Sequence, residues 1–246
     1  MSAPGGRPAA VLFDMDGTLV DTETLWWESA AEVAAGLGHH LSDADAREVV
    51  GRAVADTAAH LVRVTGTPSL DGPVPDGPSP DAVAADLAAA FLRRVDAGAP
   101  PRPGARRLLA ALEAAGVPFA LVSASPRTVV DSVVAGSLAD VAFAFTLSAD
   151  DTVRTKPHPD PYRAAAERFG VEARACVAVE DSPDGTASAE AAGCPVLVVP
   201  SLLPVAPGEG RYFAGSLEDV DLAVLETVLE GVILATSDRS FAQTSG

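Results

Sequence analysis

Two aspartates, Asp14 and Asp16, follow directly on a short apolar run at residues 10–13. Burying two carboxylates one residue apart is costly, because they repel each other and lose their hydration. Other polar segments follow later apolar runs: the Ser123-Ala124-Ser125 segment after 118–122, Lys156 several residues after 142–146, and Glu180 and Asp181 after 175–179. Carboxylates, an ammonium and hydroxyls are the groups that hold a cation and a phosphate together.

A divalent cation explains how these carboxylates could share one site. Left alone, converging carboxylates raise at least one pKa among them. A Mg²⁺ ion prefers oxygen ligands in octahedral geometry, would neutralise the carboxylates and would keep positions open for a phosphate oxygen. Lys156 adds a second positive charge and Ser123 can donate a hydrogen bond. The residue types therefore predict a Mg²⁺ site that binds a phosphate group.

The paired aspartates fit the needs of phosphoryl transfer. This reaction requires an in-line nucleophile and a proton donor for the leaving oxygen. One Asp can be the nucleophile and form an aspartyl phosphate, and a second Asp can act first as acid and then as base. The pattern predicts these two roles for Asp14 and Asp16.

The elements around these residues indicate an α/β fold with a Rossmann-like parallel sheet. Five runs without polar alternation predict strands buried on both faces, at 10–13, 118–122, 142–146, 175–179 and 195–199. Helix-length segments lie between the later runs, at 105–116, 127–136, 161–170 and 183–193. In such a sheet the functional groups gather at the carboxyl ends of the strands, where the polar residues above are placed.

A long segment between the first two strands predicts an inserted all-helical cap. It contains helical patterns at 24–38, 43–64 and 81–95, and a Pro/Gly-rich loop at 66–80. The expected organisation is an α/β core (9–19 and 101–234), a helical cap (20–100) and flexible termini (1–8 and 235–246).

Composition and charge limit the partners. Seventeen basic against thirty-four acidic residues give a net charge of −17, which disfavours binding to nucleic acid and to anionic membranes. No window approaches the roughly 18 apolar residues of a membrane helix, and the first ten residues lack the apolar core of a signal peptide. The two cysteines, Cys176 and Cys194, lie in apolar runs and are expected to be free buried thiols. We expect a cytoplasmic monomer or homodimer.

Four ordered segments resemble the motifs of the haloacid dehalogenase-like hydrolases. They read FDMDGTLVDTE, LVSAS, KPHPDPY and VEDSPDGTASAEAAG, and the resemblance extends from Val11 to about Pro200. The helical insert stands where that family places its cap. The resemblance implies the same fold, a Mg²⁺ cofactor and a cap that closes over the site and selects the substrate.

The family roles can be carried over to matching positions of this chain. The resemblance implies that Asp14 attacks phosphorus, and that Asp16 protonates the leaving oxygen and later activates water. It implies substrate binding by Ser123, Ala124 and Lys156, and Mg²⁺ ligation by Asp14, by the carbonyl of Asp16, by Asp181, and by Glu180 either directly or through water. In the cap, Arg52 is a further candidate for contact with a substrate anion.

The expected function is hydrolysis of a small phosphorylated metabolite, such as a sugar phosphate or a phosphoglycolate-like compound. A β-phosphoglucomutase-like phosphomutase is the alternative, although Val54 stands where such relatives carry a basic residue, three positions beyond Gly51. A dehalogenase would need no metal and would lack the second acid, Asp16. A phospho-accepting regulatory module would place its acceptor after a middle strand and would have no helical insert.

Overall fold

The computed structural model describes residues 6–50, 52, 54–65 and 78–231. Most of the predicted flexible termini, 1–8 and 235–246, and most of the predicted loop 66–80 lie outside these residues. The chain divides into two compact units, one formed by Met1–Val20 with Pro100–Gly246 and the other by Asp21–Ala99.

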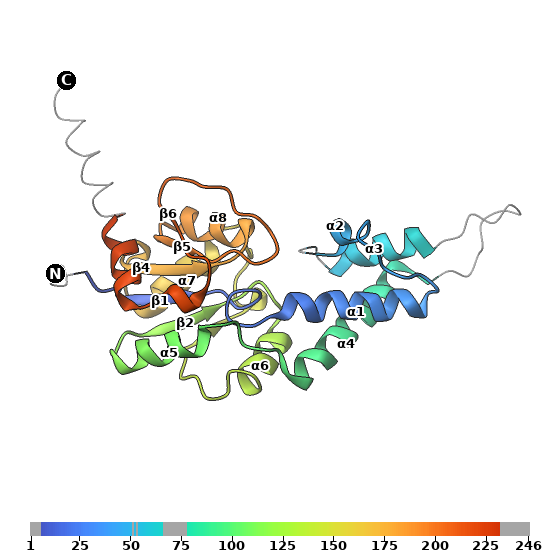
Figure 1. Cartoon of the computed structure of the whole chain (residues 1–246), viewed down its shortest axis with the longest axis horizontal. Coiled ribbons are helices and arrows are strands. Elements are labelled where there is room, and N and C mark those ends of the chain that lie inside the picture. Colours follow the sequence, from blue (N-terminus) through green and yellow to red (C-terminus); the bar gives the residue numbers. More distant parts are fainter. Residues whose placement is uncertain (1–5, 51, 53, 66–77, 232–246) are drawn as a thin grey trace, which may run out of the picture. The chain divides into compact units, whose positions relative to one another are not determined.

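The first unit is built on a parallel sheet, shown in Figure 1. Within the described residues it has six strands in the order β3-β2-β1-β4-β5-β6. Their bounds are β1 Ala10–Phe13, β2 Phe119–Val122, β3 Thr146–Leu147, β4 Cys176–Glu180, β5 Val196–Val198 and β6 Arg211–Phe213. In the centre, Val11 pairs with Phe119 on one side and Val177 on the other. Strand β1 is therefore flanked by β2 and β4, and the polar residues after all three strands meet at one edge.

Helices cover both faces of this sheet, as the predicted fold class requires. They are α5 Ala105–Ala114, α6 Arg127–Ala135, α7 Asp160–Phe169 and α8 Pro183–Ala192, with short 3-10 turns at Ala149–Asp151, Ala173–Ala175 and Leu217–Asp219; residues 222–231 are also helical. Helices α7 and α8 pack on the face formed by Leu12, Ala178 and Val196. Helices α5 and α6 lie on the opposite side of the sheet in Figure 1.

Two edge strands differ from the sequence prediction. The run 142–146 was expected to be a strand, but pairing starts only at Thr146. Instead, the ring of Phe143 packs edge-on against that of Phe119, with their centroids 5.5 Å apart, and the ring of Phe145 packs against that of Phe169 at a tilt of 45°. Strand β6 was not predicted, because its three residues, Arg211–Phe213, are half-buried or exposed and carry no apolar run.

The second unit is helical, as expected for the insert. Its helices are α1 Thr22–Gly36, α2 Ala46–Val49, α3 Val54–Thr65 and α4 Pro80–Gly98. The predicted helix 43–64 is in fact two helices, because Val50 is extended, with ψ 128°, and ends α2. The indole nitrogen of Trp26 donates to the carbonyl of Val49 at 2.9 Å, and the ring packs on the apolar cluster of this unit. Trp26 is thus a packing residue of the cap.

A buried carboxylate links the loop before α2 to α3. Asp45 is 6% exposed, and its Oδ1 lies 2.8 Å from Nε2 of His60. Its Oδ2 accepts from the backbone N–H and the hydroxyl of Ser42, both at 2.9 Å. Burial alone would raise the pKa of Asp45, but these hydrogen bonds outweigh burial and hold this pKa well below its ordinary value.

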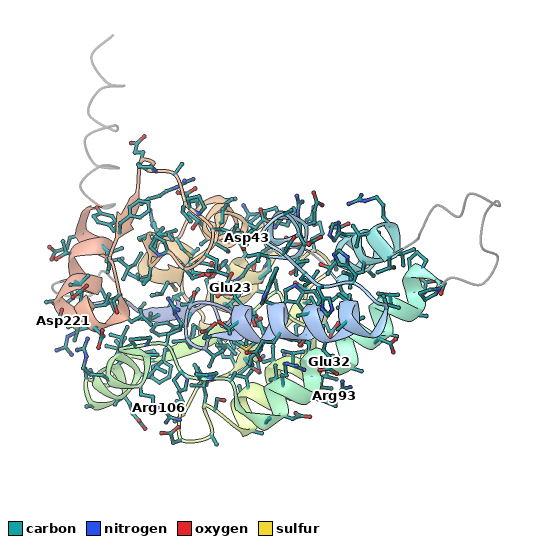
Figure 2. All side chains as sticks on the ribbon, turned by 45° about the vertical axis from the view of Figure 1, so that its right-hand side comes forward. Glu23, Glu32, Asp43, Arg93, Arg106 and Asp221 are labelled. Atoms are coloured by element: carbon teal, nitrogen blue, oxygen red, sulfur yellow. The ribbon has the colours of Figure 1, made fainter. Side chains whose placement is uncertain are left out.

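Charged side chains cover the outside of the helical unit, as Figure 2 shows for Glu32 and Arg93. These two form an exposed ion pair at 2.8 Å, which contributes little to stability. Among the described residues, no helix is both long enough and apolar enough to cross a membrane. Cys176 and Cys194 are free and buried, as predicted.

Candidate active site

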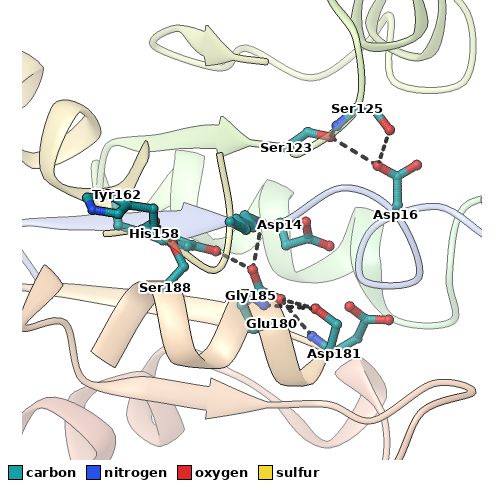
Figure 3. Close-up of polar contacts among 12 residues, drawn as sticks. Asp14, Asp16, Ser123, Ser125, His158, Tyr162, Glu180, Asp181, Gly185 and Ser188 are labelled. Carbon is teal, nitrogen blue, oxygen red and sulfur yellow. Dashed lines mark hydrogen bonds and ion pairs between the residues drawn. The ribbon is translucent and has the colours of Figure 1, made fainter. Parts of the chain in front are cut away.

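The carboxyl ends of β1, β2 and β4 bring most of the predicted site residues to one edge of the sheet (Figure 3). Asp14 directly follows β1, Ser123 directly follows β2, and β4 ends on Glu180 with Asp181 next. Asp14, Glu180 and Asp181 are 5%, 0% and 3% exposed, so the acids are taken out of bulk water. Strand order alone explains this convergence, since β1 lies between the other two strands.

Lys156 forms ion pairs with two of the acids. Its Nζ lies 2.7 Å from Oδ1 of Asp14 and 2.6 Å from Oε1 of Glu180, and its side chain is 4% exposed. Burial alone would lower the pKa of Lys156, but the two carboxylates outweigh burial and raise this pKa above its ordinary value. The lysine is therefore a fixed positive charge beside Asp14.

The single positive charge of Lys156 does not neutralise the three buried carboxylates around it. Burial raises the pKa of Asp14 well above its usual range; Lys156 opposes this shift, and the Glu180 and Asp181 carboxylates add to it. Carboxylate oxygens of Asp14, Glu180 and Asp181 lie within 4.8 Å of one another. Oδ2 of Asp14 is buried and has no hydrogen-bond partner among the described residues. A crowded, negatively charged oxygen cluster with an unpartnered oxygen fits a hard divalent cation.

The second aspartate lies apart from this cluster, on the side of β2. Oδ2 of Asp16 accepts from the hydroxyl of Ser123 at 3.0 Å and from that of Ser125 at 2.8 Å, as Figure 3 shows. The hydroxyl of Ser123 also accepts from the backbone N–H of Ser125 at 2.9 Å. A hydroxyl has one proton, so Ser123 cannot donate to Asp16 and to a substrate oxygen at the same time.

Two glycines allow the acids to approach the backbone. Gly17 has φ +80°, and a Cβ there would lie 2.2 Å from Oδ2 of Asp181. Gly185, near the start of α8, lies against the carboxylate of Glu180 (Figure 3), and a Cβ there would lie 1.9 Å from Oε2. Both positions require a residue without a side chain. This gives a physical reason for the glycine of the first DGT segment, Gly17, and for the first glycine of DGTASAEAAG, Gly185.

Three polar contacts of the site were not predicted. The hydroxyl of Tyr162 donates to Oε1 of Glu180 at 2.6 Å, that of Ser201 donates to Oδ2 of Asp181 at 2.6 Å, and Ser125 donates to Asp16. Ser125 stands in the SAS segment noted above, whereas nothing in the sequence near Tyr162 or Ser201 indicates their partners.

Two predicted substrate-binding residues are not brought into this cluster by any contact above. Ala124 follows Ser123 and is exposed. Arg52 belongs to the helical unit and is also exposed. A role of either residue in substrate binding stays a prediction.

The fold and the site define an α/β enzyme with buried acids and a lysine at the carboxyl edge of a parallel sheet. Its family follows from comparison with known proteins. A family model described as haloacid dehalogenase-like hydrolase matches residues 8–193, and the chain belongs to this family. The resemblance inferred from the four motifs is thereby confirmed, and the chain is a hydrolase.

Individual relatives cover most of the chain. The chain is 36% identical over 222 residues to the plasmid-encoded protein CbbY of Cupriavidus necator, covering 78% of each chain. It is 31% identical over 226 residues to hexitol phosphatase B of Escherichia coli, covering 92% of this chain and 96% of the relative. Among solved structures, a CbbY variant from Rhodobacter sphaeroides in complex with xylulose-(1,5)-bisphosphate has a TM-score of 0.71 at 25% identity, covering 89% and 99% of the two chains.

Proposed function

We propose that this protein is a Mg²⁺-dependent phosphatase that hydrolyses a small phosphorylated metabolite through an aspartyl phosphate on Asp14. The observation that carries the proposal is the contact of Lys156 with Asp14 and Glu180, at 2.7 and 2.6 Å, inside a buried group of three carboxylates. A buried carboxylate that is both crowded by acids and bound to a fixed ammonium is a candidate nucleophile.

The unpartnered Oδ2 of Asp14 and the convergence of acids support the metal assignment. Asp14, Asp181, the carbonyl of Asp16, and Glu180 directly or through water would hold the ion. When bound, Mg²⁺ supplies positive charge that neutralises the acids and the phosphoryl oxygens. Asp181 is kept in place by the hydroxyl of Ser201 at 2.6 Å.

The proposed reaction has two steps. A carboxylate oxygen of Asp14 forms a bond to phosphorus while the bond from phosphorus to the ester oxygen breaks, and Asp16 gives its proton to the leaving alkoxide. In the second step Asp16 takes a proton from water, whose oxygen attacks phosphorus and releases phosphate and free Asp14. Lys156 and Ser123 hold the phosphoryl oxygens in both steps.

The contact of Ser123 with Asp16 adds a condition to this mechanism. The hydroxyls of Ser123 and Ser125 both donate to Oδ2 of Asp16. When a phosphoryl oxygen accepts the Ser123 proton instead, Asp16 loses the first of these two hydrogen bonds and keeps the second. Phosphate binding would thus release Asp16 in part for its role as acid.

The relatives support a sugar or polyol phosphate as the substrate class. One of them is named a hexitol phosphatase, and one solved structure is a complex with xylulose-(1,5)-bisphosphate. We propose for this chain a substrate with a phosphate ester on a short polyhydroxylated carbon chain, processed in the cytoplasm.

A panel of phosphate esters tests the proposal. The panel contains sugar phosphates, hexitol phosphates and phosphoglycolate, and phosphate release is measured with Mg²⁺ and with excess EDTA. We expect release from at least one polyol or sugar phosphate that EDTA abolishes and that Asp14→Asn abolishes. Equal rates in EDTA would contradict the metal assignment, and isomerisation of β-glucose 1-phosphate without phosphate release would indicate a phosphomutase.

A further inference from the structure

Tyr162 is the largest fully buried side chain of the described residues, yet its polar end points to the site. It lies in the first turn of α7, and its hydroxyl donates to Oε1 of Glu180 at 2.6 Å. Its ring centroid is 5.1 Å from Nζ of Lys156. One side chain therefore contacts both the acid and the lysine that meet at Asp14.

The two oxygens of the Glu180 carboxylate have different surroundings. Oε1 accepts two short hydrogen bonds, from Lys156 and Tyr162, both at 2.6 Å. Oε2 accepts two long ones, from the backbone N–H of Asp181 at 3.3 Å and the hydroxyl of Ser182 at 3.2 Å. Oε1 is thus the firmly held oxygen, and Tyr162 supplies one of its two strong donors.

A neutral donor has a specific use at this position. Lys156 is shared between Asp14 and Glu180, so any movement of Glu180 also moves the ammonium relative to Asp14. A phenol has an ordinary pKa of about 10 and donates without adding charge. Hydrogen bonds to a charged group are stronger than neutral ones, so this contact can restrain the carboxylate.

We infer that Tyr162 is a positioning residue: its hydroxyl holds Oε1 of Glu180 so that Lys156 stays in contact with Asp14. The inference rests on the proposed function, because its consequence is a loss of rate. Tyr162 does not touch the reacting atoms; it acts through Glu180 and Lys156.

The test is a double-mutant cycle on the full chain, with Tyr162→Phe, Glu180→Gln and the double variant. The probe is p-nitrophenyl phosphate with Mg²⁺, and both kcat and KM are measured. The control is Tyr212→Phe, which makes the same change at the chain's other tyrosine, on β6. Near-UV circular dichroism checks that each variant is folded, and unfolding by urea gives a second cycle that does not depend on activity.

We expect Tyr162→Phe to lower kcat roughly tenfold, which corresponds to about 1.4 kcal/mol, with KM changed less than about twofold. In the Glu180→Gln background, Tyr162→Phe should have little further effect on kcat or on the free energy of unfolding. The reason is that residue 180 no longer carries the charged oxygen that accepts from Tyr162 and Lys156. Tyr212→Phe should keep the wild-type kcat.

An unchanged kcat in Tyr162→Phe would overturn the inference, as would effects of Tyr162→Phe and Glu180→Gln that simply multiply. If the wild-type protein releases phosphate neither from this probe nor from any ester of the panel above, the proposed function fails and the inference fails with it; an ester of the panel that is hydrolysed replaces p-nitrophenyl phosphate as the probe if only the latter is inert. An active wild type with an equally active Tyr162→Phe refutes the inference alone.

Discussion

Replacing Gly185 by alanine should destabilise the protein, although Gly→Ala within a helix usually has the opposite effect. An added methyl normally stabilises a helix by about 0.5–1 kcal/mol. At this position the new Cβ would lie 1.9 Å from Oε2 and 2.1 Å from Oε1 of Glu180, whereas ordinary contact begins at 3.4 Å. The difference between 3.4 and 1.9 Å means that the carboxylate must move by about 1.5 Å.

The Glu180 carboxylate cannot move this far without losing hydrogen bonds, because it is 0% exposed and accepts from Lys156 and Tyr162 at 2.6 Å. Lengthening a 2.6 Å hydrogen bond by that distance breaks it. Overpacking costs about 1–3 kcal/mol, and a lost hydrogen bond to a charged group costs about 1.5–3 kcal/mol. We therefore expect Gly185→Ala to lower the free energy of unfolding by about 3 kcal/mol, or the melting temperature by roughly 6–12 °C.

Activity should fall as well, because displacing Glu180 moves Lys156 relative to Asp14. A misplacement of about 1 Å in a catalytic site can lower the rate by about a hundredfold. The assays are thermal unfolding followed by circular dichroism, and phosphate release with Mg²⁺. The matched control is Gly36→Ala at the end of α1, where a Cβ would meet nothing within 4 Å. That variant should be neutral or slightly more stable, and a Gly185→Ala protein with wild-type stability and kcat would refute the reasoning.

Three further changes test other parts of the structure. Asp45→Asn should lower the free energy of unfolding by about 2–4 kcal/mol at pH 7. Because folding lowers the pKa of Asp45, its contribution to stability is present above the unfolded pKa of about 4 and is lost as pH falls below that value. The gap in melting temperature between wild type and variant should therefore shrink between pH 7 and pH 3, and a constant gap would argue against an ionised Asp45. Ser201→Ala removes the 2.6 Å donor to Asp181 and should raise the Mg²⁺ concentration for half-maximal activity roughly tenfold, with an unchanged value contradicting the ligand role. Burial raises the pKa of Cys176 to about 11, so iodoacetamide at pH 8 should label Cys176 and Cys194 in urea but not in the native protein, and rapid native labelling would show that the thiols are accessible.

The sequence was sufficient for the parts of the fold that have strong apolar runs. The central strands β1, β2 and β4 are buried on both faces, so their sequences are continuously apolar and their carboxyl ends could be located. Strand β6 could not be found in this way, because its residues are half-buried or exposed at the sheet edge and form no apolar run. The break near Val50 was missed for a related reason: the helical pattern continues through it.

The location of the candidate site in the fold could be predicted where one strand end carries several functional groups, as with Asp14 and Asp16. It could not be predicted where a single residue acts through a distant partner. Tyr162 and Glu180 are eighteen positions apart and meet only because α7 packs over the sheet beside β4. The steric role of Gly185 likewise depends on where the Glu180 carboxylate lies, which no local pattern reveals.

The most direct test of the proposed mechanism is to trap the phosphorylated enzyme. The protein is mixed with Mg²⁺ and a phosphate ester that it hydrolyses, and the reaction is quenched in acid. Acyl phosphates are then reduced with borohydride, which converts a phosphorylated aspartate to homoserine. Mass spectrometry of the peptides should place homoserine at residue 14 in the wild type and at no position in Asp14→Asn. Homoserine at another aspartate, or steady turnover with no modified residue at all, would contradict Asp14 as the nucleophile.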